Sequence, residues 1–142
     1  MLAERLGYGW EGAVYRTQAN TAIKVFKSEQ HYARERDVYL RLRACRVSEV
    51  LGFGVPRLVD FDDLLRAVEM EIVAPPFVLD FAGAKLDVPS EFPAEVLEEW
   101  ERDKEDQFED DWPLVKSVMA EFERFGVFLG DVHPGNIRVR RR

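Results

Sequence analysis

The sequence has few cysteines, few histidines and no long apolar runs, and these shortages exclude several classes of protein. A single cysteine, Cys45, among 142 residues rules out an intramolecular disulfide, so nothing indicates an oxidising compartment. We expect Cys45 to be a small buried residue on a helix. No apolar run approaches the ~18 residues that a membrane-spanning helix needs, and residues 1–5 lack an apolar signal core. We therefore expect a cytoplasmic protein with no membrane partner.

Charge is distributed unevenly along the chain, and one acidic segment contains few basic residues. The chain carries a net charge of −7, and residues 87–111 hold twelve acids and two bases, so this segment carries −10 and the rest +3. An acidic chain argues against nucleic acid as a partner. The basic residues 140–142 are interpreted as a solvated tail. Hydrophobic residues make up 46% of the chain, which is ordinary for a globular domain.

Apolar periodicity and turn residues predict an α+β fold. We expect strands at 2–6, 14–16, 21–26, 55–61, 65–73, 127–129 and 137–139, and helices at 29–43, 94–107 and 112–125. Ser28 is a good N-cap for the first helix, and the pair Pro75-Pro76 forms a stiff connector. The last helix carries an apolar stripe, which has to pack on the acidic helix through Val96, Leu97 and Trp100 or on a second subunit. The stripe consists of Leu114, Val115, Val118, Met119, Phe122 and Phe125.

Three closely spaced glycines, Gly7, Gly9 and Gly12, lie between two expected strands. Glycine has no β-carbon, so backbone N–H groups there can approach phosphate oxygens. The dinucleotide-binding version of this spacing joins a strand to a helix and is therefore disfavoured. We predict a phosphate-binding loop, with a plain glycine hairpin as the alternative.

Lys24 lies in the middle of an apolar strand. A buried ammonium group costs free energy unless it finds partners, and phosphate oxygens and a carboxylate would serve. Glu35, on the following helix, is the expected carboxylate, and Glu29 is a weaker alternative. The alternative, without a binding role, is that Lys24 lies on an edge strand and its ammonium extends to water.

Asp131 and Asn136 lie five residues apart near the end of the chain. In one class of phosphoryl-transfer loop, an Asp accepts the proton of the attacking hydroxyl, and an Asn five residues later holds a metal that bridges the phosphates. The spacing predicts Asp131 as the base and Asn136 as the metal ligand, against the alternative of a simple turn. We expect His133 either to hydrogen-bond within the loop or to approach phosphate.

Together these residues resemble the protein kinase superfamily, most of all its small, atypical bacterial members. The matching residues, in the family's order, are Gly7-x-Gly9-x-x-Gly12-x-Val14, Ala22-Ile23-Lys24, Glu35 and Asp131-x-x-x-x-Asn136. The resemblance implies an antiparallel-sheet N-lobe with one helix (1–73), a hinge or linker (74–86) and a minimal, mostly helical C-lobe (87–142). ATP would bind between the lobes.

The resemblance also implies a role for each residue. Lys24 would contact the α/β-phosphates and Glu35 would hold it, Val14 would cover the adenine ring, and Asp131 would be the base. Backbone groups of the segment from Met70 to Val73, the connector between the lobes, would contact the adenine edge, with Met70 behind it. The expected site residues there are Met70, Glu71 and Val73, and the alternative is a plain strand and loop.

The sequence departs from the family pattern in several places. Leu129 and Gly130 replace the usual His-Arg pair, and Glu11 puts a negative charge at the tip of the glycine loop. No D-F-G aspartate follows Asn136, so we expect a C-terminally truncated chain that binds Mg²⁺ weakly or with help from a partner.

Two main hypotheses follow. The first is an ATP-dependent, serine/threonine-type phosphotransferase, or one acting on a small-molecule hydroxyl, with a replacement metal ligand from 103–111 or from a partner. The second is a catalytically inactive pseudokinase that senses nucleotide or scaffolds a protein partner or a homodimer through the 114–125 helix. A gene fragment is a third interpretation.

Overall fold

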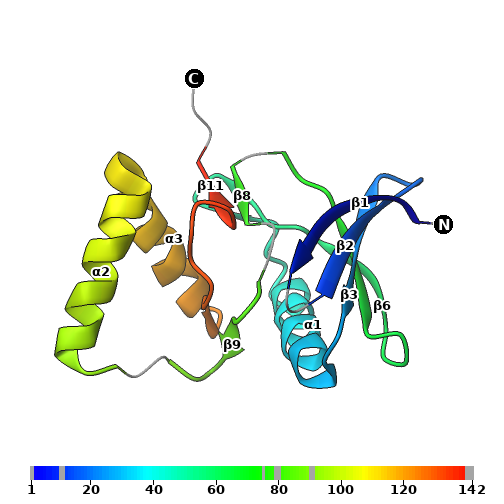
Figure 1. Cartoon of the computed structure of the whole chain (residues 1–142), viewed down its shortest axis with the longest axis horizontal. Helices are drawn as coiled ribbons and strands as arrows, with labels where there is room; N and C mark the ends of the chain where they lie inside the picture. The colour runs from blue at the N-terminus through cyan, green and yellow to red at the C-terminus, as the bar shows by residue number, and fades with distance from the viewer. Residues whose placement is uncertain (1, 10–11, 75, 79–80, 90–91, 140–142) are drawn as a thin grey trace.

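The computed structural model describes residues 2–9, 12–74, 76–78, 81–89 and 92–139. Its main feature is a five-stranded antiparallel sheet with one helix packed on it, beside a pair of helices and two small sheets (Figure 1). The predicted α+β class is confirmed. The strands of the large sheet, in spatial order, are β1 (Leu2–Gly9), β2 (Gly12–Thr17), β3 (Thr21–Phe26), β7 (Ala67–Glu71) and β6 (Leu58–Asp62).

The β2–β3 hairpin forms where the sequence predicts it. Asn20 closes the turn with φ 61°, a left-handed conformation that asparagine tolerates. The β3 side chains alternate between partly and fully buried, so Ala22, Lys24 and Phe26 share the covered face. Helix α1 (Glu29–Ala44) covers that face and contacts β3, β6 and β7.

Helix α1 begins and ends close to its predicted bounds. The Ser28 side chain accepts the backbone N–H of His31 (3.4 Å), which satisfies one of the free donors of the first turn. The buried face of the helix recurs at helical spacing and consists of Tyr32, Glu35, Val38, Tyr39 and Leu42.

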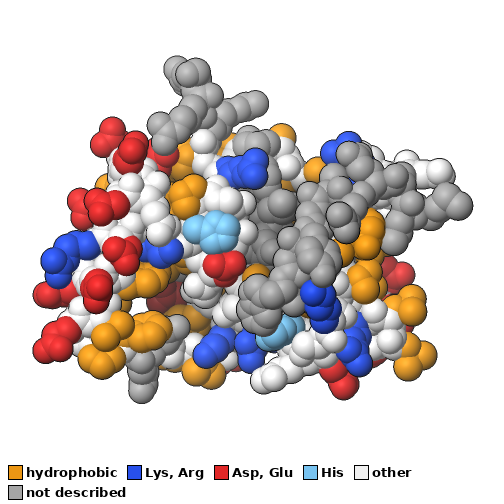
Figure 2. Space-filling view, in the orientation of Figure 1, with side chains coloured by type: hydrophobic (Ala, Val, Ile, Leu, Met, Phe, Trp, Pro, Cys, Tyr) orange, Lys and Arg blue, Asp and Glu red, His pale blue; other side chains and the backbone are white. Residues whose placement is uncertain are grey.

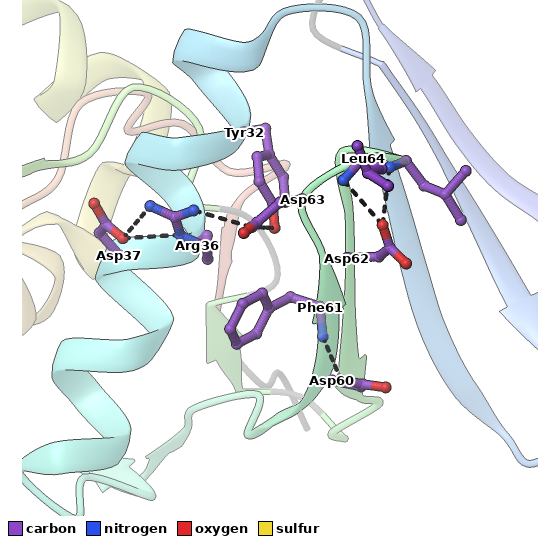
Figure 3. A network of polar contacts seen from close by, with 9 residues as sticks. Tyr32, Arg36, Asp37, Asp60, Phe61, Asp62, Asp63 and Leu64 are labelled. Carbon is purple, nitrogen blue, oxygen red and sulfur yellow. Dashed lines mark hydrogen bonds and ion pairs between the residues drawn. The ribbon is translucent and has the colours of Figure 1, made fainter.

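The turn between β6 and β7 is fastened to α1 by polar contacts (Figure 3). Tyr32 Oη donates to Asp63 Oδ1 (2.6 Å), and Arg36 Nη1 donates to the same oxygen (3.1 Å). Asp62 Oδ1 accepts the N–H groups of Leu64 and Leu65. Because Leu64 and Leu65 belong to this turn, β7 starts at Ala67 and not at the predicted position 65; it also ends at Glu71, two residues before the predicted end.

Short strands join the large sheet to the helical pair. One small sheet has the order β11 (Ile137–Arg138), β8 (Phe77–Val78), β5 (Phe53–Gly54), β4 (Glu49–Val50), and the other pairs β10 (Val127–Phe128) with β9 (Lys85–Leu86). The segment 74–86, predicted as a hinge or linker, therefore contributes a strand to each small sheet, and its Phe81 and Ala84 are fully buried. Pro75 lies outside the described residues.

The helical pair consists of α2 (Ala94–Phe108) and α3 (Trp112–Glu123), joined by the short 3₁₀ helix η1 (Glu109–Asp111). The centre of the predicted α3 stripe is buried within the chain, since Val115, Val118 and Phe122 are fully covered. The prediction that α3 packs through Val96 and Leu97 is wrong, because both side chains remain exposed.

The stripe is covered instead by an aromatic series that runs from α3 to α1. The Phe122 ring lies 5.7 Å from that of Phe81, which lies 5.1 Å from that of Tyr39, both edge to face. Trp100 supplies the contact between the two C-terminal helices, with its ring 5.7 Å from that of Trp112. The sheet, α1 and α3 therefore share one core.

Arg41 adds a polar connection between α1 and the start of β10. Its guanidinium binds the Asp87 carboxylate (2.8 Å) and the Phe125 carbonyl (3.0 Å) and lowers the pKa of Asp87. Gly126, at φ 78°, fits between these groups because a β-carbon there would collide with the Asp87 carboxylate.

The buried position predicted for Cys45 is wrong. Its thiol is free and exposed, because the residue follows the last turn of α1 and lies beyond the face that packs on the sheet. Among the described residues, no helix is both long and apolar enough to cross a bilayer.

Candidate functional site

The first polar group of the candidate site is a buried ion pair. Lys24 Nζ lies 3.0 Å from Glu35 Oε1, and the two residues are 5% and 3% exposed. The ammonium also lies 4.8 Å from the centre of the Phe26 ring. The pairing predicted from the sequence is therefore present, whereas Glu29 is exposed at the start of α1.

Strand register brings the glycine segment next to this ion pair. Gly7 lies opposite Val14, Val14 opposite Lys24, and Lys24 opposite Val68, which forms one row across four strands. Directly opposed residues project to the same face of an antiparallel sheet. Val14, which is half-buried, and Lys24 are thus neighbours on one face, with the Gly7 backbone beside them.

The other glycines lie at the end of the β1–β2 hairpin. Gly9 pairs with Gly12, and a β-carbon at Gly12 would collide with the Val25 carbonyl. Gly12 therefore has a structural reason to be glycine, whatever it binds. The tip of this hairpin, with the Glu11 charge predicted from the sequence, lies outside the described residues.

The residues of the predicted connector, from Met70 to Val73, differ in their burial and contacts. Met70 is fully buried in β7 opposite Ala22, where it lines the face that carries Lys24. The Glu71 N–H is donated to the Arg57 carbonyl (2.9 Å), and its carboxylate pairs with the Arg57 side chain (3.0 Å). Contacts to a ligand edge would therefore fall to the half-buried residues after Glu71, including Val73.

The second polar group lies on the loop between β10 and β11. Asn136 Nδ2 donates to the backbone carbonyl of Asp131 (2.7 Å) and to its Oδ2 (3.2 Å). His133 Nε2 lies 3.4 Å from the same carboxylate oxygen. Asp131 and Asn136 are thus brought together, with His133 as a third member that the sequence could not assign.

Hydrogen bonding sets the orientation of His133. The Gly135 N–H donates to His133 Nδ1 (3.0 Å), so Nδ1 acts as an acceptor. In a neutral imidazole the proton then lies on Nε2, which faces Asp131. The Asn136 amide therefore holds Asp131 Oδ2, with His133 Nε2 3.4 Å away, and Oδ1 is the oxygen left to meet a ligand.

Ala82 and Gly83, which sequence analysis did not single out, shape this loop. A β-carbon at Gly130 would collide with the Gly83 carbonyl, so the two backbones can approach only because Gly130 is glycine. The Asp131 N–H donates to the neighbouring Ala82 carbonyl (3.2 Å). Glycine at position 130 thus has a packing reason, and no local sequence signal reveals that contact.

Packing connects the two polar groups. Glu35 and Tyr39 lie one turn apart on α1, Tyr39 contacts Phe81, and Phe81 precedes the Ala82 carbonyl that holds Asp131. In Figure 1 the loop lies between the large sheet and the α2–α3 pair. The ion pair and the loop are thus held by one buried connection.

The oxygen atoms of the loop suit a hard cation. Because Asn136 uses its Nδ2 toward Asp131, its Oδ1 is the atom that it can offer, together with Asp131 Oδ1. Mg²⁺ accepts one or two such ligands and completes its shell with water and phosphate oxygens. Within the described ranges, no three His, Cys, Asp or Glu side chains gather as a metal site, including those of the 103–111 segment.

No protein-family model and no curated protein matches this chain. Function is therefore inferred from the ion pair, the strand register and the loop.

Proposed function

We propose that this chain is a kinase-like ATP-binding domain in which nucleotide lies between the large sheet and the loop from Leu129 to Ile137. The phosphoryl group would pass to a serine, threonine or small-molecule hydroxyl. The observation that carries the proposal is the buried Lys24–Glu35 pair, at 3.0 Å.

A buried ion pair is a weak source of stability, because removing two charges from water costs several kcal/mol per ion. A pair of apolar side chains would fill the same space between β3 and α1 at a lower cost. The pair has a clear use if Lys24 also has to meet phosphate oxygens, since Glu35 then fixes its ammonium in place. The adjacent Gly7 and Val14 support this interpretation, because a phosphate chain and a flat ring could lie along the same row.

The loop supplies the groups that transfer would need. Asp131 Oδ1 would accept the proton of the attacking hydroxyl, while the contacts from Asn136 and His133 hold Oδ2 and fix the carboxylate plane. A Mg²⁺ ion bound with ATP would neutralise phosphate charge. Asn136 Oδ1 is the atom of this loop that would face it.

One observation favours an inactive, nucleotide-binding alternative. Both Asn136 and His133 engage the carboxylate of Asp131, which is also how a loop is stiffened without chemistry. A pseudokinase of this kind would bind ATP through Lys24 and transmit occupancy to a partner.

The replacement Asp131→Asn separates these functions. The enzyme hypothesis predicts at least a hundredfold loss of ADP release with unchanged ATP affinity, since general-base catalysis contributes roughly 10²–10⁴-fold. Asp110→Asn, on the exposed η1 helix, is the matched control and should leave turnover unchanged. Equal turnover in wild type and Asp131→Asn would exclude Asp131 as the base, and binding without turnover would favour the pseudokinase.

A further inference from the structure

A cavity that is separate from the ion pair lies between the helical pair and the start of the 129–137 loop. It encloses about 280 Å³ and is lined mostly by apolar side chains. Phe92, Leu97, Trp100 and Met119 form its walls, and Glu123 is its charged member. Phe92 and Leu97 are 54% and 44% exposed, so the cavity opens to solvent through large apolar groups.

Exposed apolar surface continues beyond the cavity. Val88 and Val96, which are next in sequence to the lining residues Pro89 and Leu97, are also about half exposed, at 55% and 46%. Contiguous exposed apolar surface in a globular domain commonly marks a binding site. A surface longer than the cavity itself fits an extended chain segment better than a compact small molecule.

The surroundings of the cavity are strongly acidic. Helix α2 carries seven acids and two bases, and Figure 2 shows acidic side chains gathered over it. Glu101 lies one helical turn from Leu97, so it flanks the cavity on the same side of α2. Lys104 Nζ lies 5.8 Å from the centre of the Trp100 ring, so this aromatic side chain of the cavity already makes a cation–π contact.

The position of Glu123 does not stabilise α3, which suggests that this residue has a role in binding a ligand. It is the last residue of α3, where the partial negative charge of the helix end disfavours a carboxylate. A basic residue there would stabilise the helix instead. The acid is therefore better explained by a positively charged ligand at the cavity it lines.

We propose that this groove, between α2, α3 and the loop start, docks a peptide segment of a partner protein that has one large apolar residue flanked by arginine or lysine. The apolar side chain fills the cavity against Leu97 and Trp100. The cationic side chains meet Glu101 and Glu123. Because Leu129 and Gly130 also line the cavity, the bound segment lies beside the loop that carries Asp131.

The test is fluorescence anisotropy with a labelled nine-residue peptide that has a central leucine and three arginines, measured without nucleotide. We expect saturable binding that weakens at least tenfold when the peptide leucine becomes serine, and also in Leu97→Ser. Leu64→Ser, at the exposed β6–β7 turn, is the matched control and should bind normally. Glu123→Lys should weaken binding at least fivefold without lowering the melting temperature, whereas Asp110→Lys should change neither.

Three outcomes would overturn the proposal. One is the absence of saturable binding, and another is binding that ignores the leucine and Leu97, since that is charge attraction alone. The third is self-association of the free protein that disappears in Leu97→Ser while the peptide does not bind, since the groove would then belong to a second copy. Because no ATP is present, none of these results depends on the proposed nucleotide site.

Discussion

At the scale of single residues, Lys24 and Glu35 form the most deeply buried ion pair among the described residues. Both charges lie between β3 and α1, among Phe26, Val38 and other core residues. Such a pair is expensive to assemble, and removing one member takes away the opposite charge that lies 3.0 Å from the other.

The first prediction therefore concerns Lys24→Met, which keeps the apolar length of the side chain and removes its charge. We expect a loss of about 3–5 kcal/mol in the free energy of unfolding, because Glu35 is left buried beside an apolar group. The double variant Lys24→Met/Glu35→Leu should recover most of that loss. Lys116→Met, on the exposed face of α3, should change stability by less than about 0.5 kcal/mol. Urea unfolding measures all three variants, and a fully stable Lys24→Met would show that the pair is not buried as described.

Gly130 is the second residue whose replacement has a definite consequence. In Gly130→Ala the added methyl group meets the Gly83 carbonyl, which is backbone and cannot rotate away. We expect a loss of about 1–3 kcal/mol as the two segments separate. Gly54→Ala is the matched control, since its new β-carbon would lie 3.5 Å from Val73 Cβ, an ordinary contact. Thermal unfolding compares the two, and equal melting temperatures would contradict the close approach of Gly130 to Gly83.

At the scale of elements, the contact between α1 and the β6–β7 turn gives a pH dependence (Figure 3). Burial, followed by the hydrogen bond to Asp63, raises the pKa of Tyr32 from 10.0 to about 12. The hydrogen bonds from Tyr32 and Arg36 lower the pKa of Asp63. Folding thus holds the phenol proton and favours the ionised carboxylate.

The direction of each effect follows from linkage. The Tyr32 contribution is complete below the usual tyrosine pKa of about 10 and is lost as the pH rises toward 12. The Asp63 contribution is present above the usual aspartate range and is lost as the pH falls through the lowered pKa. We expect Tyr32→Phe to be less stable than wild type at neutral pH and to lose less stability between pH 10 and 12. Urea unfolding across that range would refute this if the two curves stay parallel.

The longer elements and the short strands β10 and β11 could be predicted from sequence, whereas four other short strands could not. The Ser28 cap and helical spacing placed α1 within one residue of its observed end, because local hydrogen bonds and amphipathicity determine a helix. The two-residue strands β4, β5, β8 and β9 have no periodicity to detect, since contacts with distant segments create them. For the same reason the burial of Phe81, in a segment predicted as a hinge or linker, was not foreseen.

The candidate site likewise has some contacts that the sequence predicts and others that it does not. Residue type and order were enough to pair Lys24 with Glu35 and to place Asp131 with Asn136. The supporting contacts of Ala82 and Gly83 join segments about fifty residues apart in the chain, and no local pattern carries that information. The groove of α2 and α3 was hidden because the sequence predicted that Leu97 would be covered by α3.

At the scale of the whole molecule, one core connects the large sheet to the loop that carries Asp131. Tyr39, Phe81 and Phe122 run from α1 to α3, and Arg41 joins the same two regions through Asp87 and the Phe125 carbonyl. The ion pair and the loop should therefore keep a fixed relation to each other, as a nucleotide bound between them would require.

The most direct test of this account is calorimetric titration of ATP into the protein with and without Mg²⁺. The account predicts saturable binding that Mg²⁺ strengthens and that falls at least tenfold in Lys24→Met/Glu35→Leu, with Lys116→Met unchanged. ATP binding that does not change with Mg²⁺ but requires Lys24 would favour the nucleotide-sensing alternative. Binding of equal strength in the double variant, or no binding of ATP at all, would contradict the proposed nucleotide site.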